Sequence, residues 1–315
     1  MKLIESKAEL VLQQEGLEGV YKQIEFCGRT CYKSEDKITE DSAKGFVERV
    51  IKSGHGAMLE HGTVYLFIKI SAYDRTLIYH IQEYEKNPYS KVIYLGFDDN
   101  EETNFEDILR YPATGDMQYV VTTNYRVLVE NGWLDDLKYL CEPTEYHERR
   151  ITVHFVCDRG VSHELVRHRV FSFAQESTRY CNYSKDKFGK ELTFMKPAWD
   201  TTLKPDQFGE DRSLPFFLSE AEALYNRLIN NCGWTPQQAR MILPNCLKTE
   251  ICMTGFASDW RFFFDLRYYG ETGKPHPDME LLASKARSEF MKAGLWDNIM
   301  ACPTKFDKDD TEGKD

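Results

Sequence analysis

The stretch from Ser162 to Tyr183 constrains this 315-residue chain most, because it gathers basic side chains among aromatic and hydroxyl residues. Its basic residues are Arg167, His168, Arg169 and Arg179. An arginine guanidinium binds phosphate oxygens bidentately, and aromatic rings stack on flat heterocycles. The stretch therefore predicts a site for phosphorylated ligands with planar rings. The alternative is a solvated helix end with ordinary surface arginines.

The charge balance sets this stretch apart from the rest of the chain. A net charge of −11 at pH 7 argues against non-specific binding to nucleic acid, because such binding relies on basic residues that neutralise phosphates. Residues 159–190 nevertheless hold seven Lys or Arg against three Asp or Glu, a local balance of +4. A basic patch on an acidic protein suits a small anionic ligand better than a polymer.

The composition is that of a soluble globular protein, with 42% hydrophobic and 29% charged residues. No apolar run approaches the length that spans a bilayer, and the first residues lack the apolar core of a signal peptide. We therefore expect no membrane partner and a cytoplasmic location. The nine cysteines are scattered without a Cys-x-x-Cys pair, which favours free thiols in a reducing compartment.

Hydrophobic periodicity predicts the elements of the first half. The predicted elements are helices at about 16–30, 41–52 and 125–130, a glycine-rich loop at 54–61, and strands at 63–70, 91–95 and 119–123. Residues 71–150 give mixed signals and no chemistry, and no change in composition marks a linker. We therefore expect one domain over residues 1–303 with an insertion at about 71–150, and a disordered charged tail at 304–315.

The second half is predicted from its helix-capping residues. A strand at 151–156 leads to a helix with Ser162 at its N-cap. A capping box at 219–222 opens a helix that runs to about 232, and Pro236 opens another that carries Arg240. Residues 277–292 form the last predicted helix.

Two common kinds of catalytic site do not fit the sequence. His163 and His168 are five residues apart, which places them about 140° apart around a helix, whereas a zinc-protease helix needs histidines four apart. We therefore expect no metal. The chain has no Walker loop, no Gly-x-Ser-x-Gly and no Gly-x-Gly-x-x-Gly, so any dinucleotide is not held by a Rossmann fold.

One pattern is more specific: Arg167-His168-Arg169, seven residues, and then Ser177, with Arg179 two positions later. It resembles the signature of the flavin-dependent thymidylate synthases. Three further segments resemble this family in the same order along the chain. They are the histidine loop at 54–61, the arginine–Leu-Pro segment at 239–244, and Asp265-Leu-Arg267, where the family's late arginine is expected.

The resemblance implies a fold and an activity. The implied fold is α+β: a single mixed domain with an antiparallel sheet packed against long helices, assembled as a homotetramer whose sites are shared between subunits. The implied reaction methylates dUMP to dTMP, with 5,10-methylenetetrahydrofolate as carbon donor and FAD, reduced by NADPH, as hydride source. Reduced flavin makes a cysteine nucleophile unnecessary, and Cys246, which follows Pro244-Asn245, looks structural.

The resemblance also implies residue roles. The implied FAD contacts are Arg167, His168, Arg169, His55, Glu60 and Gln175. The implied dUMP contacts are Glu164, Gln175, Ser177, Arg179, Arg240 and Arg267. The implied catalytic residues are Arg267, Ser177 and His55. A phosphomonoester carries nearly two charges, which suits a clamp of two arginines, and a cation facing the uracil would stabilise negative charge on its carbonyls.

Three positions depart from the family pattern. Phe262 stands where a polar residue near the flavin is usual, and Ala57 and Cys31 replace expected hydroxyls. These departures put individual flavin hydrogen bonds in doubt. Phe262 also leaves open an alternative, a flavin or nucleotide binder that has lost catalysis.

Overall fold

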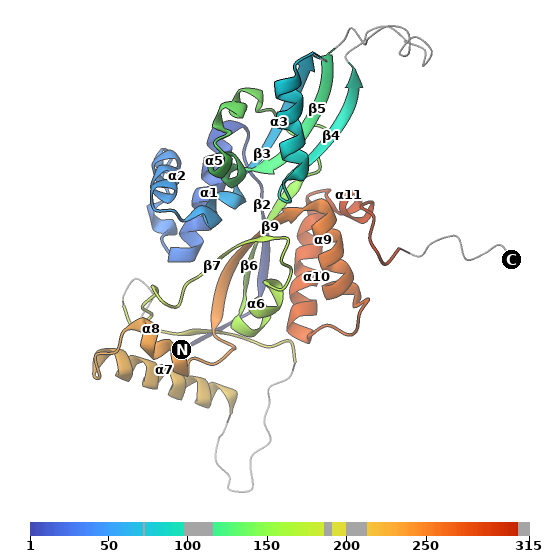
Figure 1. The fold of residues 1–315 in the computed structure, drawn as a ribbon. Coiled ribbons are helices and arrows are strands. Elements are labelled where there is room, and N and C mark those ends of the chain that lie inside the picture. Colours follow the sequence, from blue (N-terminus) through green and yellow to red (C-terminus); the bar gives the residue numbers. More distant parts are fainter. Residues whose placement is uncertain (72, 98–115, 186–190, 200–212, 308–315) are drawn as a thin grey trace, which may run out of the picture. The chain divides into compact units, whose positions relative to one another are not determined.

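The computed structural model divides the chain into two compact units, each described here by itself (Figure 1). Unit 1 comprises Met1–Val11, Cys27–Lys37 and Ile151–Asp315, and unit 2 comprises Leu12–Phe26 and Ile38–Arg150. The structure describes residues 1–71, 73–97, 116–185, 191–199 and 213–307. No helix among these residues is long and apolar enough to cross a membrane. Of the predicted tail at 304–315, the residues from 308 on lie outside the described residues.

The centre of unit 1 is a four-stranded sheet. Its strand order is β2 (Lys7–Val11), β6 (Arg150–Asp158), β9 (Lys248–Phe256) and β7 (Ser172–Gln175). β2 runs antiparallel to β6, and β7 runs antiparallel to β9. A separate short pair, β1 (Lys2–Ile4) and β8 (Thr193–Met195), is parallel. The mixture of helices with mainly antiparallel strands confirms the predicted α+β class.

One face of this sheet is covered by the C-terminal helices α9 (Ala257–Phe264), α10 (Pro277–Lys292) and α11 (Trp296–Met300) (Figure 1). Trp260 lies at the centre of the resulting core, and its indole N–H donates to the carbonyl oxygen of Ile151 at 3.0 Å. α9 continues into a π-helical turn, η6 (Asp265–Tyr269). The helix predicted at 277–292 is confirmed, and η6 carries Arg267 away from the core.

Two predicted helix starts in unit 1 are wrong. α6 spans Arg159–Leu165, because the carboxylate of Asp158 accepts the backbone N–H of Val161 at 2.7 Å and caps the helix earlier than Ser162 would. Ser162 lies inside the helix, and its hydroxyl donates to the carbonyl oxygen of Arg159. Arg167 therefore lies beyond the helix end.

α7 spans Leu214–Asn230, so it begins five residues before the predicted capping box at Ser219. The hydroxyl of Ser219 instead donates to the carbonyl oxygen of Phe216 at 2.7 Å. The predicted start at Pro236 is confirmed: α8 (Pro236–Ala239) begins there, with a capping box at Thr235. The prediction that this helix carries Arg240 is wrong, because α8 is followed by a 3-10 turn, η5 (Arg240–Ile242). Arg240 is thus on the turn that follows α8.

Unit 2 is built on an antiparallel sheet with the strand order β3 (Thr63–Ser71), β5 (Asp116–Asn124), β4 (Lys91–Phe97). Its helices are α1 (Gly16–Tyr32, up to residue 26), α2 (Ser42–Lys52), α3 (Arg75–Lys86) and α5 (Tyr125–Asn131), with 3-10 turns η2 (Gly56–His61) and η3 (Leu134–Tyr139). The predicted helices near 16–30, 41–52 and 125–130 and all three strands are confirmed, whereas α3 was not predicted.

Close packing of α1 on the backbone in unit 2 requires a glycine at position 62. A Cβ at Gly62 would lie 2.7 Å from the side chain of Ile24 and 2.8 Å from that of Val20, so α1 packs directly on the backbone before β3. Residues 71–150, the predicted insertion, fall within unit 2 together with residues 38–70. That the two units make up one domain stays a prediction.

Candidate functional site

Three of the predicted site residues meet in unit 1. The guanidinium of Arg267 on η6 donates to the carboxylate of Glu164 at 2.7 Å and to the backbone carbonyl of the same residue at 3.2 Å. Its Nε donates to Nε2 of His168 at 3.1 Å. The arginine side chain is 19% exposed, so it is held in place on two sides while one edge stays open to solvent.

His168 is the buried member of this cluster, 6% exposed and surrounded by the rings of Phe171, Phe262 and Phe263. Burial, and secondarily the charge of Arg267, lower the pKa of His168 to about 4. The imidazole is therefore neutral at pH 7. Because its Nε2 accepts from Arg267, its proton belongs on Nδ1.

A cavity of about 690 Å³ opens beside this cluster. Its lining includes Arg267, Glu164 and His168 together with Arg167 and Arg169, which are both exposed. Among the described residues, neither of these two arginines pairs with a carboxylate. The signature arginines thus line a cavity large enough for a small ligand, with their charges available to bind it.

Phe262 lines the same cavity and lacks polar atoms to hydrogen-bond a ligand. Its ring lies parallel to that of Phe306, with centroids 6.0 Å apart, and the ammonium of Lys305 lies 4.8 Å from its centroid. The departure from the family pattern therefore creates an apolar wall, which suits the flat face of a ring.

A second cluster joins the end of the signature to α8 and η5. Arg179 donates from Nε to the side-chain oxygen of Gln237 at 3.3 Å, and Arg240 donates to the hydroxyl of Thr178 at 3.4 Å. Both arginines are exposed. The Ser177 hydroxyl accepts the backbone N–H of Arg179 at 3.3 Å. Two guanidinium groups, a hydroxyl and backbone N–H groups are thus gathered within one chain.

Gln175 and Cys31 adjoin this second cluster. The Gln175 amide donates to the hydroxyls of Ser162 at 2.9 Å and Thr249 at 3.2 Å, which orients its carbonyl oxygen. The carbonyl of Cys31 accepts the backbone N–H of Ser177 at 3.0 Å. Burial raises the pKa of the Cys31 thiol to about 11, so it stays protonated.

His55 and Glu60 belong to unit 2. His55 is exposed and caps the 3-10 turn η2, and its backbone carbonyl accepts the N–H of Met58 at 3.2 Å. Glu60 lies at the other end of the turn, where its carboxylate pairs with Arg126 at 2.5 Å and its carbonyl accepts from Arg150 at 2.9 Å. Ala57 between them is exposed and offers no hydrogen-bonding side chain.

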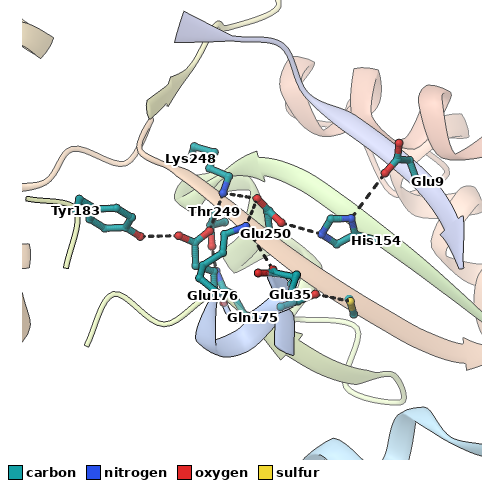
Figure 2. Close-up of polar contacts among 12 residues, drawn as sticks. Glu9, Glu35, His154, Gln175, Glu176, Tyr183, Lys248, Thr249 and Glu250 are labelled. Atoms are coloured by element: carbon teal, nitrogen blue, oxygen red, sulfur yellow. Dashed lines mark hydrogen bonds and ion pairs between the residues drawn. The ribbon is translucent and has the colours of Figure 1, made fainter. Parts of the chain in front are cut away.

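Sequence reasoning missed a charged cluster of unit 1 around the buried Glu176 and the partly buried Lys248 and Glu250 (Figure 2). The signal that would have found part of it is the alternation of Lys248 and Glu250, which places both on one face of a strand. No group of three or more His, Cys, Asp or Glu in the described ranges is arranged to hold a metal ion.

The comparisons with known proteins agree with the position of these clusters. Residues 143–293 match the family model described as "Thymidylate synthase complementing protein". The chain is similar to the flavin-dependent thymidylate synthase of Pyrococcus furiosus, 32% identical over 115 residues that make up 35% of this chain and 43% of that protein. Over the matched residues, the chain is therefore similar to the flavin-dependent thymidylate synthases.

Two more family comparisons describe the extent of the likeness. The probable flavin-dependent thymidylate synthase of Paramecium bursaria Chlorella virus 1 is 27% identical over 147 residues, 45% of this chain and 66% of that protein. The chain thus spans about half the length of the curated relatives it matches. One solved structure is that of the UMP/dUMP methylase PolB from Streptomyces cacaoi bound with 5-Br dUMP. Its superposition covers 95% of this chain and 96% of the PolB chain, with 16% sequence identity and a TM-score of 0.40.

The family match divides the predicted site residues. All of those in unit 1, from Glu164 to Arg267, fall inside residues 143–293, whereas His55 and Glu60 fall outside. Residues 71–142 also lie outside the match, so most of the predicted insertion at 71–150 is not part of what the family model recognises.

Proposed function

We propose that this chain methylates dUMP to dTMP, with 5,10-methylenetetrahydrofolate as carbon donor and FAD, reduced by NADPH, as source of the hydride. The observation that carries the proposal is the cavity in which Arg267, braced by Glu164 and His168, stands beside the two exposed arginines of the family signature. Burial raises the pKa of the Cys246 thiol, which supports a reaction without a cysteine nucleophile.

The residues of the cavity fit a flavin dinucleotide. In this proposal, Arg167 and Arg169 bind the pyrophosphate, because unpaired guanidinium groups are suited to phosphate oxygens. The neutral ring of His168 and the apolar face of Phe262 suit a flat heterocycle. His55, Glu60 and Gln175, which do not line this cavity, are proposed as further FAD contacts. The bound flavin supplies the hydride, and the protein supplies binding, orientation and electrostatics.

The second cluster fits the nucleotide. Arg179, Arg240 and Ser177 bind the phosphate of dUMP in this proposal, and we refer to these three residues as the phosphate clamp. A phosphomonoester with nearly two negative charges matches two guanidinium groups and a hydroxyl.

Arg267 faces the uracil in this proposal, with Glu164 and Gln175 as hydrogen-bonding neighbours. Negative charge that develops on the pyrimidine carbonyls is stabilised by a cation held in a partly buried site. The ion pair with Glu164 and the hydrogen bond to neutral His168 fix the guanidinium before the substrate binds, so little reorganisation is needed.

The proposal extends to the surroundings of the enzyme. Its partners are the small molecules dUMP, folate and NADPH, and the assembly is a homotetramer in which the sites are shared between subunits. A cytoplasmic location without nucleic-acid or membrane partners is in keeping with the acidic net charge of −11.

The test is a turnover assay with purified protein. Protein supplied with FAD, NADPH, dUMP and 5,10-methylenetetrahydrofolate should form dTMP, and omission of the folate should abolish the product. Absence of dTMP with flavin demonstrably bound would refute the proposed activity. Binding of dUMP without turnover would instead favour the alternative suggested by Phe262, a nucleotide binder that has lost catalysis.

A further inference from the structure

We infer that Glu176 is a positioning residue for the phosphate clamp: a buried ion-pair network holds it, and through it the backbone at Ser177 and Arg179. This inference rests on the proposed function, because it concerns the affinity of the same site for dUMP. It goes beyond the implied residue roles, since neither Glu176 nor its partners Lys248 and Glu250 had been given one.

Glu176 is tied at three points (Figure 2). One carboxylate oxygen accepts the hydroxyl of Tyr183 at 2.8 Å, and the other accepts the ammonium of Lys248 at 2.9 Å. Its backbone N–H donates to the carbonyl oxygen of Glu250 at 2.8 Å. With 2% of its surface exposed, the residue cannot exchange these partners for water. Its main chain and side chain are therefore fixed to β9.

The charges around Glu176 compensate one another. Lys248 pairs with both Glu176 and Glu250, and Glu250 pairs in turn with Lys33. Lys33 also pairs with Glu35 at 3.6 Å, so the network holds two lysines and three carboxylates. Nε2 of His154 adds a hydrogen bond to Glu250 at 3.1 Å. Burial alone would lower the pKa of Lys248, but the two carboxylates raise it to about 12. Lys248 therefore stays charged, and its charge depends on both carboxylates.

The network borders the clamp directly. Ser177 follows Glu176, and its backbone N–H donates to the carbonyl of Cys31, two residues before Lys33. The Ser177 carbonyl accepts the N–H groups of Tyr180 and Cys181 at 3.2 and 3.0 Å, which closes the turn that carries Arg179. The end of α1 therefore holds both the clamp, through Cys31, and the ion network, through Lys33.

A neutral side chain at position 176 changes the charge balance without changing the shape. In Glu176→Gln, Lys248 loses one of its two carboxylate partners and keeps only Glu250, which it shares with Lys33. We expect the turn at Ser177–Arg179 to become less ordered, so that binding the phosphate costs more. The uracil-facing cluster should be spared, because Arg267 is held by His168 and Glu164, neither of which belongs to this network.

The experiment measures equilibrium binding by calorimetry in wild type and Glu176→Gln. We expect the dissociation constant of dUMP to rise about tenfold or more, which is about 1.4 kcal/mol of binding free energy. The dissociation constants of deoxyuridine, which lacks the phosphate, and of FAD should change less than about twofold by the same reasoning. A merely structural role would not produce this selective loss of phosphate-dependent affinity.

Two further variants complete the design. Asp136→Asn is the matched control, because Asp136 in unit 2 is also a buried carboxylate that accepts from a tyrosine hydroxyl and a second donor, here Tyr84 and His80. It should lower stability and leave the affinity for dUMP unchanged. Tyr183→Phe removes a single hydrogen bond to Glu176 and should weaken dUMP binding about threefold. If Glu176→Gln does not fold, the dUMP affinity of Tyr183→Phe tests the positioning role instead, and an unchanged affinity refutes it.

The outcomes separate this inference from the proposed function. If wild type binds dUMP and folded Glu176→Gln binds it equally well, the positioning role is refuted and the proposed function stands. If Asp136→Asn raises the dissociation constant of dUMP as much as Glu176→Gln does, the positioning role is also refuted, because the effect would then reflect general destabilisation. If wild-type protein binds no dUMP, both proposals fail together.

Discussion

Acidification should reduce the free energy of unfolding by about 3 kcal/mol through one side chain, His168. Burial, and secondarily the charge of Arg267, lower its pKa from 6.5 to about 4 in the folded protein. Below pH 6.5 the unfolded chain takes up a proton that the folded protein does not, so unfolding becomes more favourable until about pH 4. Each pH unit of this window is worth about 1.4 kcal/mol. The contribution is complete above pH 6.5 and is lost as the pH falls through the window.

The assay is urea unfolding, followed by circular dichroism between pH 4 and pH 7.5. The comparison protein is His168→Gln, in which the side-chain oxygen takes the place of Nε2 as acceptor for Arg267 and does not titrate. Protonation of carboxylates such as Glu250 affects both proteins, so the difference between them isolates the histidine. Wild type should lose about 3 kcal/mol more than the variant between pH 6.5 and pH 4. Parallel curves would show that His168 is not held neutral by its surroundings.

Three further predictions address the two clusters and the core beneath them. Arg267→Ala should lower the rate of dTMP formation about 10- to 150-fold, because the variant loses a charge-assisted contact with the uracil. Its absorbance spectrum should show that flavin is still bound, and an unimpaired rate would contradict the role of Arg267. Arg240→Ala should raise the dissociation constant of dUMP about 10- to 150-fold and leave that of deoxyuridine unchanged, whereas equal weakening of both would show that it does not bind the phosphate. Gly255→Ala should lower the free energy of unfolding by about 1–3 kcal/mol, because its Cβ would lie 2.4 Å from the ring of Phe171; an unchanged urea midpoint would contradict this packing.

The helices that the sequence predicted well are those with a regular apolar stripe. α2 and α10 each bury residues at helical spacing in the hydrophobic core of their unit, so their periodicity is visible without tertiary information. The starts of α6 and α7 were misplaced because Ser and Glu at the right spacing also occur inside helices. The competing signals, Asp158 before α6 and Pro215 at the start of α7, are both local and had been passed over.

The contacts within the site were less predictable than its residues. The resemblance singled out Arg267, Glu164 and His168, but the bonds that join them link residues 103 and 99 positions apart. The strand β9 was not predicted at all, and with it the alternation of Lys248 and Glu250 on one face was missed. Long-range strand pairing decides which charges meet, and no local pattern in the sequence encodes it.

The central claim is that bound flavin supplies the hydride with which dUMP is methylated. The most direct measurement is a single-turnover reaction with stoichiometric FAD, reduced by NADPH, then mixed with dUMP and 5,10-methylenetetrahydrofolate without oxygen. Our account predicts dTMP in an amount equal to the flavin that is reoxidised, and no dTMP when flavin is left out. Flavin reoxidation without dTMP, or dTMP formed in the absence of flavin, would contradict it.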